Sequence, residues 1–297
     1  MASITRTIAF EAPLDLAGSL APLGRWGDDG LDRWDGTRLM RTVRISFGVG
    51  HAVAYRARPR GSVDAPALEV TADAAAFESV AEVVRSSFVA DDAALAALCA
   101  ADEVVAAAAR AYPGVRPVIH QDPFTALIRS ISAQQVNLTW AATTRRRLGE
   151  HFGTELAIAG ETVFVLEPDR LASATVEQLR ALQLTNAKAR SVIGVAQAAL
   201  DGCLDRAALA AMDDAALTER LVALPGIGPW SADWYLARTL GRPRVVAGDL
   251  GVRKAIGRAY LSGRMPSETA VRELTAHWGV AAGVAQQLLL HDLAMRP

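Results

Sequence analysis

The stretch from Leu224 to Ala232, which reads LPGIGPWSA, restricts the fold more than any other part of the chain. Pro225 is expected to end the helix before it, because proline has no amide hydrogen and its ring clashes with the preceding turn. Gly226 and Gly228 can adopt positive φ angles at little steric cost. Pro229 suits the first turn of a new helix. The stretch therefore predicts two helices joined by a tight glycine turn.

The backbone amides of this turn are expected to point the same way as the N-terminus of the second helix. Amides on Gly226, Ile227 and Gly228 would then form an anion site that suits one DNA phosphate. Such a contact positions DNA and does not read its bases. An ordinary connection between two helices can contain the same glycines, so this pattern alone leaves both interpretations open.

Composition places the chain among ordered globular proteins, with 51% hydrophobic and 21% charged residues, and 297 residues suffice for two or three domains. The net charge of −1 does not indicate nucleic acid, although a small positive excess between Pro123 and Tyr260 permits a basic face there. We find no apolar run long enough to span a membrane and no apolar core of a signal peptide at the start. A cytoplasmic protein without membrane contact is expected.

Strand signals are confined to the first part of the chain. Residues 38–47, 52–58 and 66–71 favour strands, residues 48–51 favour a hairpin turn, and residues 74–88 favour a helix. Almost no strand signal follows residue 91. Helices are expected there over residues 91–111, from Pro123 onward, and over 137–152, 168–174, 176–182, 187–200 and 213–224.

Asp249 follows the glycine turn by about twenty residues and directly precedes a helical pattern. An aspartate in this position commonly caps the helix, and a cap alone says little about function. The combination of the glycine turn with this aspartate resembles the helix-hairpin-helix DNA glycosylase superfamily, in particular its alkylbase branch of the 3-methyladenine DNA glycosylase II type. Further matches are Asp122-Pro123-Phe124, Ile131-Ser132-Ala133-Gln134-Gln135 and Asn186-Ala187-Lys188-Ala189-Arg190.

The resemblance implies an α+β protein with an N-terminal antiparallel sheet domain and two mostly helical lobes. The expected domains are 1–90, a central lobe over 122–241 that carries the hairpin, and a second lobe formed by 91–121 and 242–297. The resemblance also implies a monomer that binds duplex DNA containing damaged bases.

Asp249 occupies the position of the family's catalytic carboxylate, which stabilises positive charge on the sugar as the N-glycosidic bond breaks. Trp230 stands where bifunctional relatives have a lysine, and an indole cannot form a Schiff base. The resemblance therefore implies a monofunctional glycosylase for alkylated bases such as 3-methyladenine and 7-methylguanine. Three alternatives stay open: a glycosylase for deaminated or oxidised bases, a non-catalytic DNA-binding protein, and a helical scaffold.

Other site residues follow from the same resemblance. Trp230 and Trp234 lie one helical turn apart, so a flipped base could stack on them, although both could instead belong to the core. Gln135 matches a side chain that fills the gap left by the flipped base, although a surface or helix-packing role stays open for it. Gln134 is expected to contact DNA. Surface positions are favoured over phosphate contacts for Arg145, Arg146, Arg147, Lys188 and Arg190.

No cofactor is required by this interpretation. In relatives, carbonyl groups of the hairpin bind a monovalent cation, and by position these would be Val222, Leu224 and Ile227, with Na⁺ or K⁺ as the ion. Cys99 and Cys203 are the two cysteines of the chain, so a four-cysteine iron–sulfur cluster is excluded.

Overall fold

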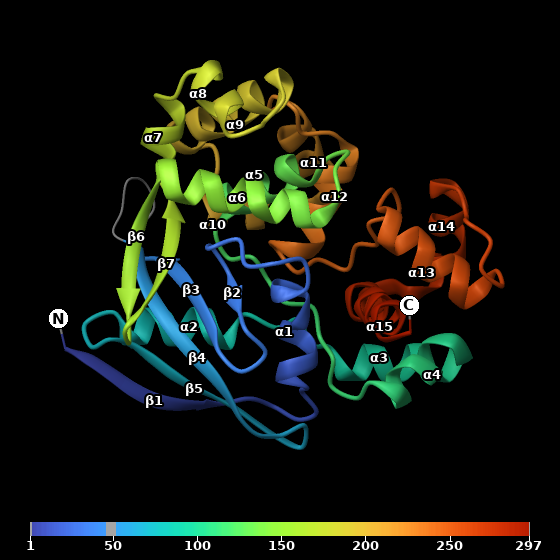
Figure 1. Ribbon diagram of the computed structural model, residues 1–297. Helices are drawn as coiled ribbons and strands as arrows, with labels where there is room; N and C mark the ends of the chain where they lie inside the picture. The colour runs from blue at the N-terminus through green and yellow to red at the C-terminus, as the bar shows by residue number, and fades with distance from the viewer. Residues whose placement is uncertain (1, 46–51, 297) are drawn as a thin grey trace.

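The computed structural model describes residues 2–45 and 52–296. A five-stranded antiparallel sheet occupies the first third of the chain, and helices dominate the rest (Figure 1). The expected α+β class, with an N-terminal antiparallel sheet followed by helices, is confirmed. The turn predicted over residues 48–51, and the end of the strand predicted over 38–47, lie outside the described residues.

The N-terminal part contains five strands and two helices. They are β1 (Ser3–Ala9), α1 (Leu16–Gly24), β2 (Arg33–Trp34), β3 (Leu39–Arg44), β4 (Ala52–Ser62), β5 (Ala65–Asp73) and α2 (Phe77–Arg85). The strands predicted in this part are present, and β1 and β2 are additions that the sequence analysis missed.

All neighbours in this sheet are antiparallel, in the order β1-β5-β4-β3-β2. Strand pairing gives alternate residues to opposite faces. One face buries Tyr55, Leu68 and Val70 against α1 and α2, whose Leu20 and Val80 are fully enclosed. The apolar alternation of the strands therefore fixes which face receives the helices.

The other face of the sheet meets a second, two-stranded sheet that was not predicted from the sequence. Strands β6 (Gly153–Ile158) and β7 (Glu161–Leu166) form a hairpin, and Ile158 and Val163 pack on Met40 and Ala54 of the large sheet. The expectation of helices alone after residue 91 is wrong here. Ala159 and Gly160, both with positive φ, form the two-residue turn typical of such hairpins.

Thirteen α-helices other than α1 and α2, with one short 3₁₀ helix, cover the described chain from residue 92 onward. The bounds are α3 (Asp92–Ala101), α4 (Glu103–Ala111), α5 (Pro123–Ala133), α6 (Leu138–Phe152), α7 (Pro168–Ala172), α8 (Val176–Ala181), α9 (Asn186–Leu200), α10 (Arg206–Ala211), α11 (Asp214–Val222), α12 (Pro229–Arg238), α13 (Leu250–Tyr260), α14 (Glu268–Thr275), η1 (Ala276–Ala281) and α15 (Ala282–Met295).

The helix predicted over residues 91–111 is in fact two helices, α3 and α4, because Asp102 interrupts it. Asp102 has an extended backbone, and its Oδ1 accepts hydrogen bonds from the amides of Val104 and Val105. Its Oδ2 accepts hydrogen bonds from the Tyr260 hydroxyl at 2.6 Å and from His277 Nε2 at 2.8 Å. This buried carboxylate thus joins α4 to α13 and η1, which the local alanine-rich pattern could not reveal.

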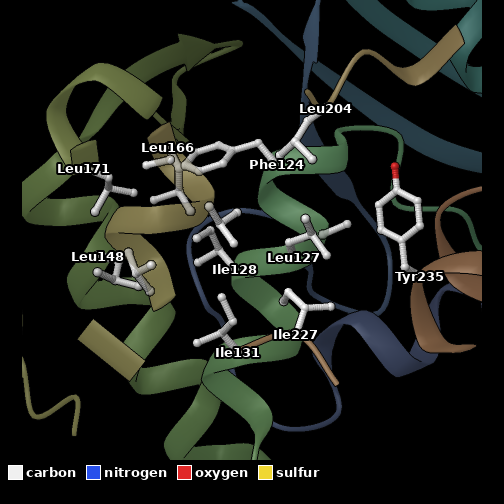
Figure 2. Close-up of a cluster of buried hydrophobic side chains, with 14 of the residues drawn as sticks. Phe124, Leu127, Ile128, Ile131, Leu148, Leu166, Leu171, Leu204, Ile227 and Tyr235 are labelled. Atoms are coloured by element: carbon white, nitrogen blue, oxygen red, sulfur yellow. The ribbon is translucent and has the colours of Figure 1, made fainter. Parts of the chain in front are cut away.

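Separate hydrophobic clusters lie beneath these elements. One lies under the large sheet. A second surrounds α5, whose Leu127, Ile128 and Ile131 are fully buried among α6, α9 and α12 (Figure 2). A third combines α4 with α13 and α15. Trp234 on α12 contacts both helical clusters, so α12 lies at the junction between them.

Candidate active site

Asp249 caps the N-terminus of α13 with one oxygen and leaves the other free. Its Oδ1 accepts a hydrogen bond from the Val252 amide at 3.0 Å, and its own amide donates to the Val246 carbonyl at 2.9 Å. Among the residues that the structure describes, none donates to Oδ2. The side chain belongs to a half-buried residue, so it is rigidly oriented yet not sealed in the interior.

Trp230 lies beside the residue that precedes Asp249. A β-carbon built on Gly248 would lie 3.6 Å from Trp230 Cδ1 and 3.2 Å from Glu268 Oε2. Trp230 is the second residue of α12 and therefore follows the glycine turn directly. The structure thus brings together the turn, the indole and the carboxylate, which the sequence separates by about twenty residues.

Glu268 is a second carboxylate near Asp249 that the sequence analysis did not identify. It accepts a hydrogen bond from Arg272 at 2.7 Å, and Arg272 also donates to the buried Asp233 at 3.0 Å. Glu268 lies nineteen positions beyond Asp249, and only the packing of α14 beside the 248–249 segment brings it close.

Trp230, Trp234 and Arg238 follow one another at intervals of four residues and so lie along one face of α12. Both tryptophans are partly exposed, and both pack against the cluster of α13 and α15. Burial lowers the pKa of Arg238, and the charge of Asp249 acts in the opposite direction. Arg238 Nη1 donates to Gln287 Oε1 at 2.8 Å, which fixes this cation within electrostatic reach of Asp249.

Gly226 and Gly228 differ in what surrounds them. Gly226 has φ of +74°, and a β-carbon there would lie 2.0 Å from Ser191 Oγ. Gly228 is the N-cap residue of α12 with an extended backbone, and a β-carbon there would meet nothing within 4 Å. Ile227 between them is buried. Gly226 is therefore needed for the turn itself, whereas Gly228 leaves open space next to the first amides of α12.

Gln134 and Gln135 end α5 and have different surroundings. Gln134 Nε2 donates to the Gly226 carbonyl at 2.9 Å and to Ser231 Oγ at 3.3 Å, so this side chain braces the glycine turn. Gln135 has φ of +55° and is exposed. Val136, which follows it, is also exposed. Of the two predicted site residues, Gln135 is exposed and Gln134 is half-buried.

Replacing each glycine by alanine separates the two roles. Gly226→Ala should destabilise the protein by about 1–3 kcal/mol, because it adds a clash with Ser191 to an unfavourable φ. Gly228→Ala should leave the free energy of unfolding nearly unchanged. It should still weaken binding to a duplex with an abasic-site analogue about 10-fold, because the new methyl group obstructs charge-assisted hydrogen bonds to a phosphate. Unchanged affinity of Gly228→Ala would exclude this turn as a phosphate site.

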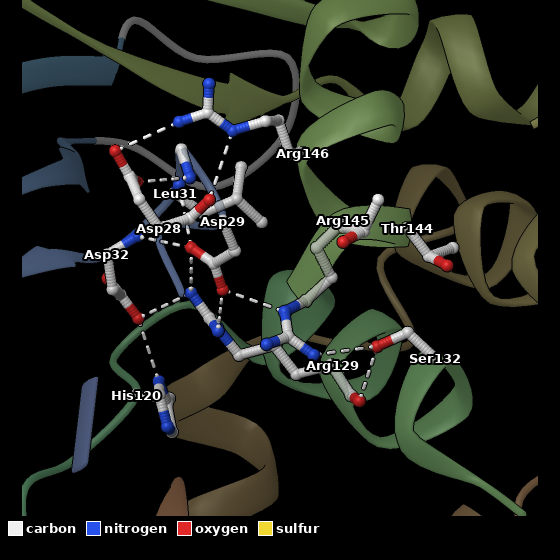
Figure 3. A network of polar contacts seen from close by, with 12 residues as sticks. Asp28, Asp29, Leu31, Asp32, His120, Arg129, Ser132, Thr144, Arg145 and Arg146 are labelled. Atoms are coloured by element: carbon white, nitrogen blue, oxygen red, sulfur yellow. Dashed lines mark hydrogen bonds and ion pairs between the residues drawn. The ribbon is translucent and has the colours of Figure 1, made fainter. Parts of the chain in front are cut away.

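The three consecutive arginines of α6 do not share a surface role. The Arg145 side chain is only 12% exposed and donates to Asp29 Oδ2 at 2.8 Å and to Ser132 Oγ at 3.1 Å. Neither predicted role, solvated surface or phosphate contact, is correct for Arg145. Arg146 forms an ion pair with Asp28 at 3.0 Å (Figure 3), and the half-buried Arg147 lies over the Trp140 ring.

Of the two other predicted surface cations, Lys188 also forms a hydrogen bond within the protein. Its Nζ donates to the Ser132 carbonyl at 3.0 Å, and burial lowers its pKa. Together with Arg145, Lys188 therefore anchors the end of α5 just before Gln134 and Gln135. For Arg190, on the same helix, the structure shows an exposed residue.

A buried cluster of charges joins the N-terminal domain to α5 and α6 (Figure 3). Asp29 is paired with Arg129 at 2.5 Å and with Arg145 at 2.8 Å. Asp32 is paired with Arg41 at 2.7 Å and with Arg129 at 2.8 Å. The contacts with Arg129 and Arg145 connect residues about one hundred positions apart, and no motif in the sequence indicated them.

The three residues expected to present carbonyl groups to a cation lie around the glycine turn. Val222 is the last residue of α11, and the Leu224 carbonyl accepts a hydrogen bond from the Ile227 amide at 3.2 Å. Within the part of the chain that the structure describes, no three His, Cys, Asp or Glu side chains gather in a way that would bind a metal ion. Cys99 and Cys203 are free thiols. None of the helices over residues 2–45 and 52–296 has the length and apolar character needed to cross a membrane.

Comparison with known proteins agrees with this geometry. A family model described as HhH-GPD superfamily base excision DNA repair protein matches residues 128–279. DNA-3-methyladenine glycosylase of Bacillus subtilis (strain 168) is 29% identical over 180 residues, which cover 60% of this chain and 59% of that protein. The chain therefore matches less than two thirds of the length of this curated relative.

Two solved structures share the fold over almost the whole chain. The structure of 3-methyladenine DNA-glycosylase from Archaeoglobus fulgidus has a TM-score of 0.82 at 22% identity, covering 98% of this chain and 99% of that one. The 8-oxoguanine glycosylase/lyase of Clostridium acetobutylicum, in complex with double-stranded DNA, has a TM-score of 0.72 at 16% identity, covering 99% and 98%. At these identities, both similarities concern the fold alone.

Proposed function

The chain belongs to the HhH-GPD superfamily of base excision DNA repair proteins, and we propose that it is a monofunctional DNA glycosylase that releases alkylated bases from duplex DNA. The observation that carries this proposal is the position of Asp249. Its carboxylate has one oxygen fixed by the Val252 amide, and the adjoining Gly248 lies beside Trp230 at the start of α12. The same helix, α12, therefore begins at the turn proposed to bind a phosphate and lies beside the Asp249 carboxylate.

Asp249 would act on the sugar. Cleavage of an N-glycosidic bond develops positive charge at C1′, and a carboxylate fixed before the reaction stabilises that charge without having to reorganise. The same group would orient the water that attacks C1′, or accept its proton. The free Oδ2 is the atom available for both tasks, because Oδ1 is used by the helix cap.

Trp230 and Trp234 would receive the flipped base. An indole face attracts a cationic alkylated purine by about 0.5–2 kcal/mol. Such bases are good leaving groups, so the reaction places little demand on a general acid. Because Trp230 has no amine that could attack C1′, the product would be an intact strand with an abasic site.

Duplex DNA would bind across the surface that carries the turn at Gly226–Gly228 and the end of α5. The exposed Gln135, in its left-handed conformation, would fill the gap left by the flipped nucleotide. Gln134 would act indirectly by bracing the turn, since its side chain is bonded to the Gly226 carbonyl. We propose a monomer located in the cytoplasm.

A monovalent cation such as Na⁺ or K⁺ would fit the carbonyl groups of Val222, Leu224 and Ile227. The last carbonyls of a helix have no intrahelical donor, and α11 ends at Val222. Neutral carbonyl oxygens suit a monovalent cation. The bound ion would make the turn that binds the phosphate more rigid. The proposal includes no other cofactor.

A panel of duplexes tests the proposal against its rivals. The protein should release 3-methyladenine and 7-methylguanine from methylated duplex DNA, and the strand should break only after alkali treatment. Borohydride should trap no covalent complex. Release of deaminated or oxidised bases without alkylated ones would favour the alternative lesions. Binding to abasic-site DNA without release of any base would favour a non-catalytic binding protein.

A further inference from the structure

His120 connects the N-terminal domain to the tryptophan face of α12. Its imidazole stacks on the Trp234 indole, with ring centroids 5.4 Å apart and planes inclined by 23°. Its amide donates to the Arg238 carbonyl at 2.8 Å, and its Nδ1 lies 3.0 Å from Asp32 Oδ2 (Figure 3). The ring therefore has a fixed position beside the middle of the tryptophan face.

The contacts of Asp32 determine which ring nitrogen carries the hydrogen. Burial alone would raise the pKa of Asp32, but Arg41 and Arg129 lower it well below its usual value. An ionised carboxylate can only accept hydrogen bonds, so Nδ1 must be the donor. Burial lowers the pKa of His120 to about 4, against the raising effect of Asp32. The ring is thus neutral at pH 7, and Nε2 has a free lone pair.

Nε2 lies on the side of the ring opposite Asp32 (Figure 3). No hydrogen-bond partner for it occurs among residues 2–45 and 52–296. The side chain retains 15% of its exposed surface. A hydrogen-bond acceptor without a protein donor therefore lies next to Trp234 and is open to a ligand.

The position of His120 relative to Asp249 indicates which part of a base it would meet. Trp230 lies beside Gly248 at the sugar end of the site. Trp234 is one turn, about 5.4 Å, farther along α12, and His120 stacks on it. A purine whose glycosidic nitrogen lies near Asp249 would direct its opposite edge toward His120.

We propose that His120 is a specificity-determining residue whose Nε2 accepts a hydrogen bond from the 6-amino group of an adenine-type lesion. This inference rests on the proposed glycosylase function. At the same position a guanine-type lesion carries a carbonyl oxygen, which is itself an acceptor and cannot satisfy Nε2. A base that covers this acceptor without donating to it is disfavoured, because the acceptor loses water and gains no partner.

The test is the ratio of the two bases released by wild type and His120→Phe from the same methylated duplex. Phenylalanine keeps a ring against Trp234 but removes both nitrogens. Single-turnover release of 3-methyladenine should fall about 3- to 10-fold more than release of 7-methylguanine, as expected for the loss of one hydrogen bond. An equal change in both rates would overturn the proposal, because a merely structural role of His120 affects both bases alike.

A second measurement uses the wild-type protein alone and covers the case in which His120→Phe does not fold. Free 3-methyladenine should inhibit base release about 3- to 10-fold more strongly than 3-methylpurine, which lacks the amino group. Equal inhibition would contradict the role of Nε2. If the wild type releases neither base, the proposed glycosylase function fails, which is a different result from an unaltered ratio.

Discussion

Asp29→Asn is expected to lower the free energy of unfolding by about 3–5 kcal/mol. The Asp29 side chain is 2% exposed and is the carboxylate that Arg129 and Arg145 share. Removing one partner of a buried ion pair leaves charge uncompensated where water cannot reach it. Asparagine retains an oxygen that can accept from the Leu31 and Asp32 amides, so the change removes mainly the charge. Denaturant unfolding gives the free energy directly.

The adjacent Asp28 provides the matched control. It forms ion pairs with Arg33 and Arg146, but its side chain is 36% exposed. Exposed pairs contribute about 0–1 kcal/mol, so Asp28→Asn should have little effect. If Asp28→Asn and Asp29→Asn lower the stability equally, the buried cluster does not connect the N-terminal domain to α5 and α6 as we infer.

The free energy of unfolding of the wild type should depend on pH because of the same buried cluster. Burial alone would raise the pKa of Asp29, but Arg129 and Arg145 lower it to about 2, from an ordinary value of 3.8. A lowered pKa in the folded state means that this contribution is complete above pH 3.8 and is lost as the pH falls toward 2. In Asp29→Asn, the loss of stability between pH 3.8 and 2 that protonation of Asp29 causes in the wild type should be absent.

Features of the fold that depend on neighbours in sequence were predictable. Proline and glycine placed the turn before α12, and aspartates at helix starts marked the caps of α5 and α13. The alternating strands of the N-terminal sheet followed from their side-chain pattern. Each of these features depends on residues only a few positions apart, so it can be recognised from one sequence.

Features that depend on distant contacts were not predictable. The pairing of Arg145 with Asp29 spans 116 positions, and the run of three arginines gives no indication that one is buried. Asp102 divides a helix because its partners include Tyr260, 158 positions away. The β6–β7 hairpin turns at Ala159 and Gly160, whose positive φ angles are seen only in the structure, and its strands lie among helical patterns.

In the candidate site too, residues in local motifs were predictable and residues placed by distant contacts were not. The motif and the resemblance identified Asp249, Trp230 and the glycine turn. His120 and Glu268 lie in segments without a motif, and only the fold brings them beside α12 and the 248–249 segment. Gln134 was expected to contact DNA, and only its hydrogen bond to the Gly226 carbonyl indicates the bracing role.

Asp249→Asn is expected to lower the rate of base release about 10²- to 10³-fold, the usual loss when one preorganised electrostatic group is removed from a site. Asparagine caps helices about as well as aspartate, so the hydrogen bond from the Val252 amide should persist and α13 should stay in place. The variant should therefore fold normally and bind DNA with nearly unchanged affinity.

Asp213→Asn is the matched control for this change. Asp213 caps α11 by accepting a hydrogen bond from the Ala216 amide at 2.8 Å, as Asp249 caps α13. The two substitutions alter a helix cap in the same way, but only one removes the carboxylate beside Trp230. Asp213→Asn should therefore release bases at the wild-type rate.

The most direct test of the account is single-turnover release of 3-methyladenine from a methylated duplex by wild type and Asp249→Asn, with affinity for an abasic-site duplex measured in parallel. We predict that the variant binds this duplex like the wild type while releasing the base at least about 100-fold more slowly. Release at the wild-type rate by Asp249→Asn would show that this carboxylate does not drive the reaction.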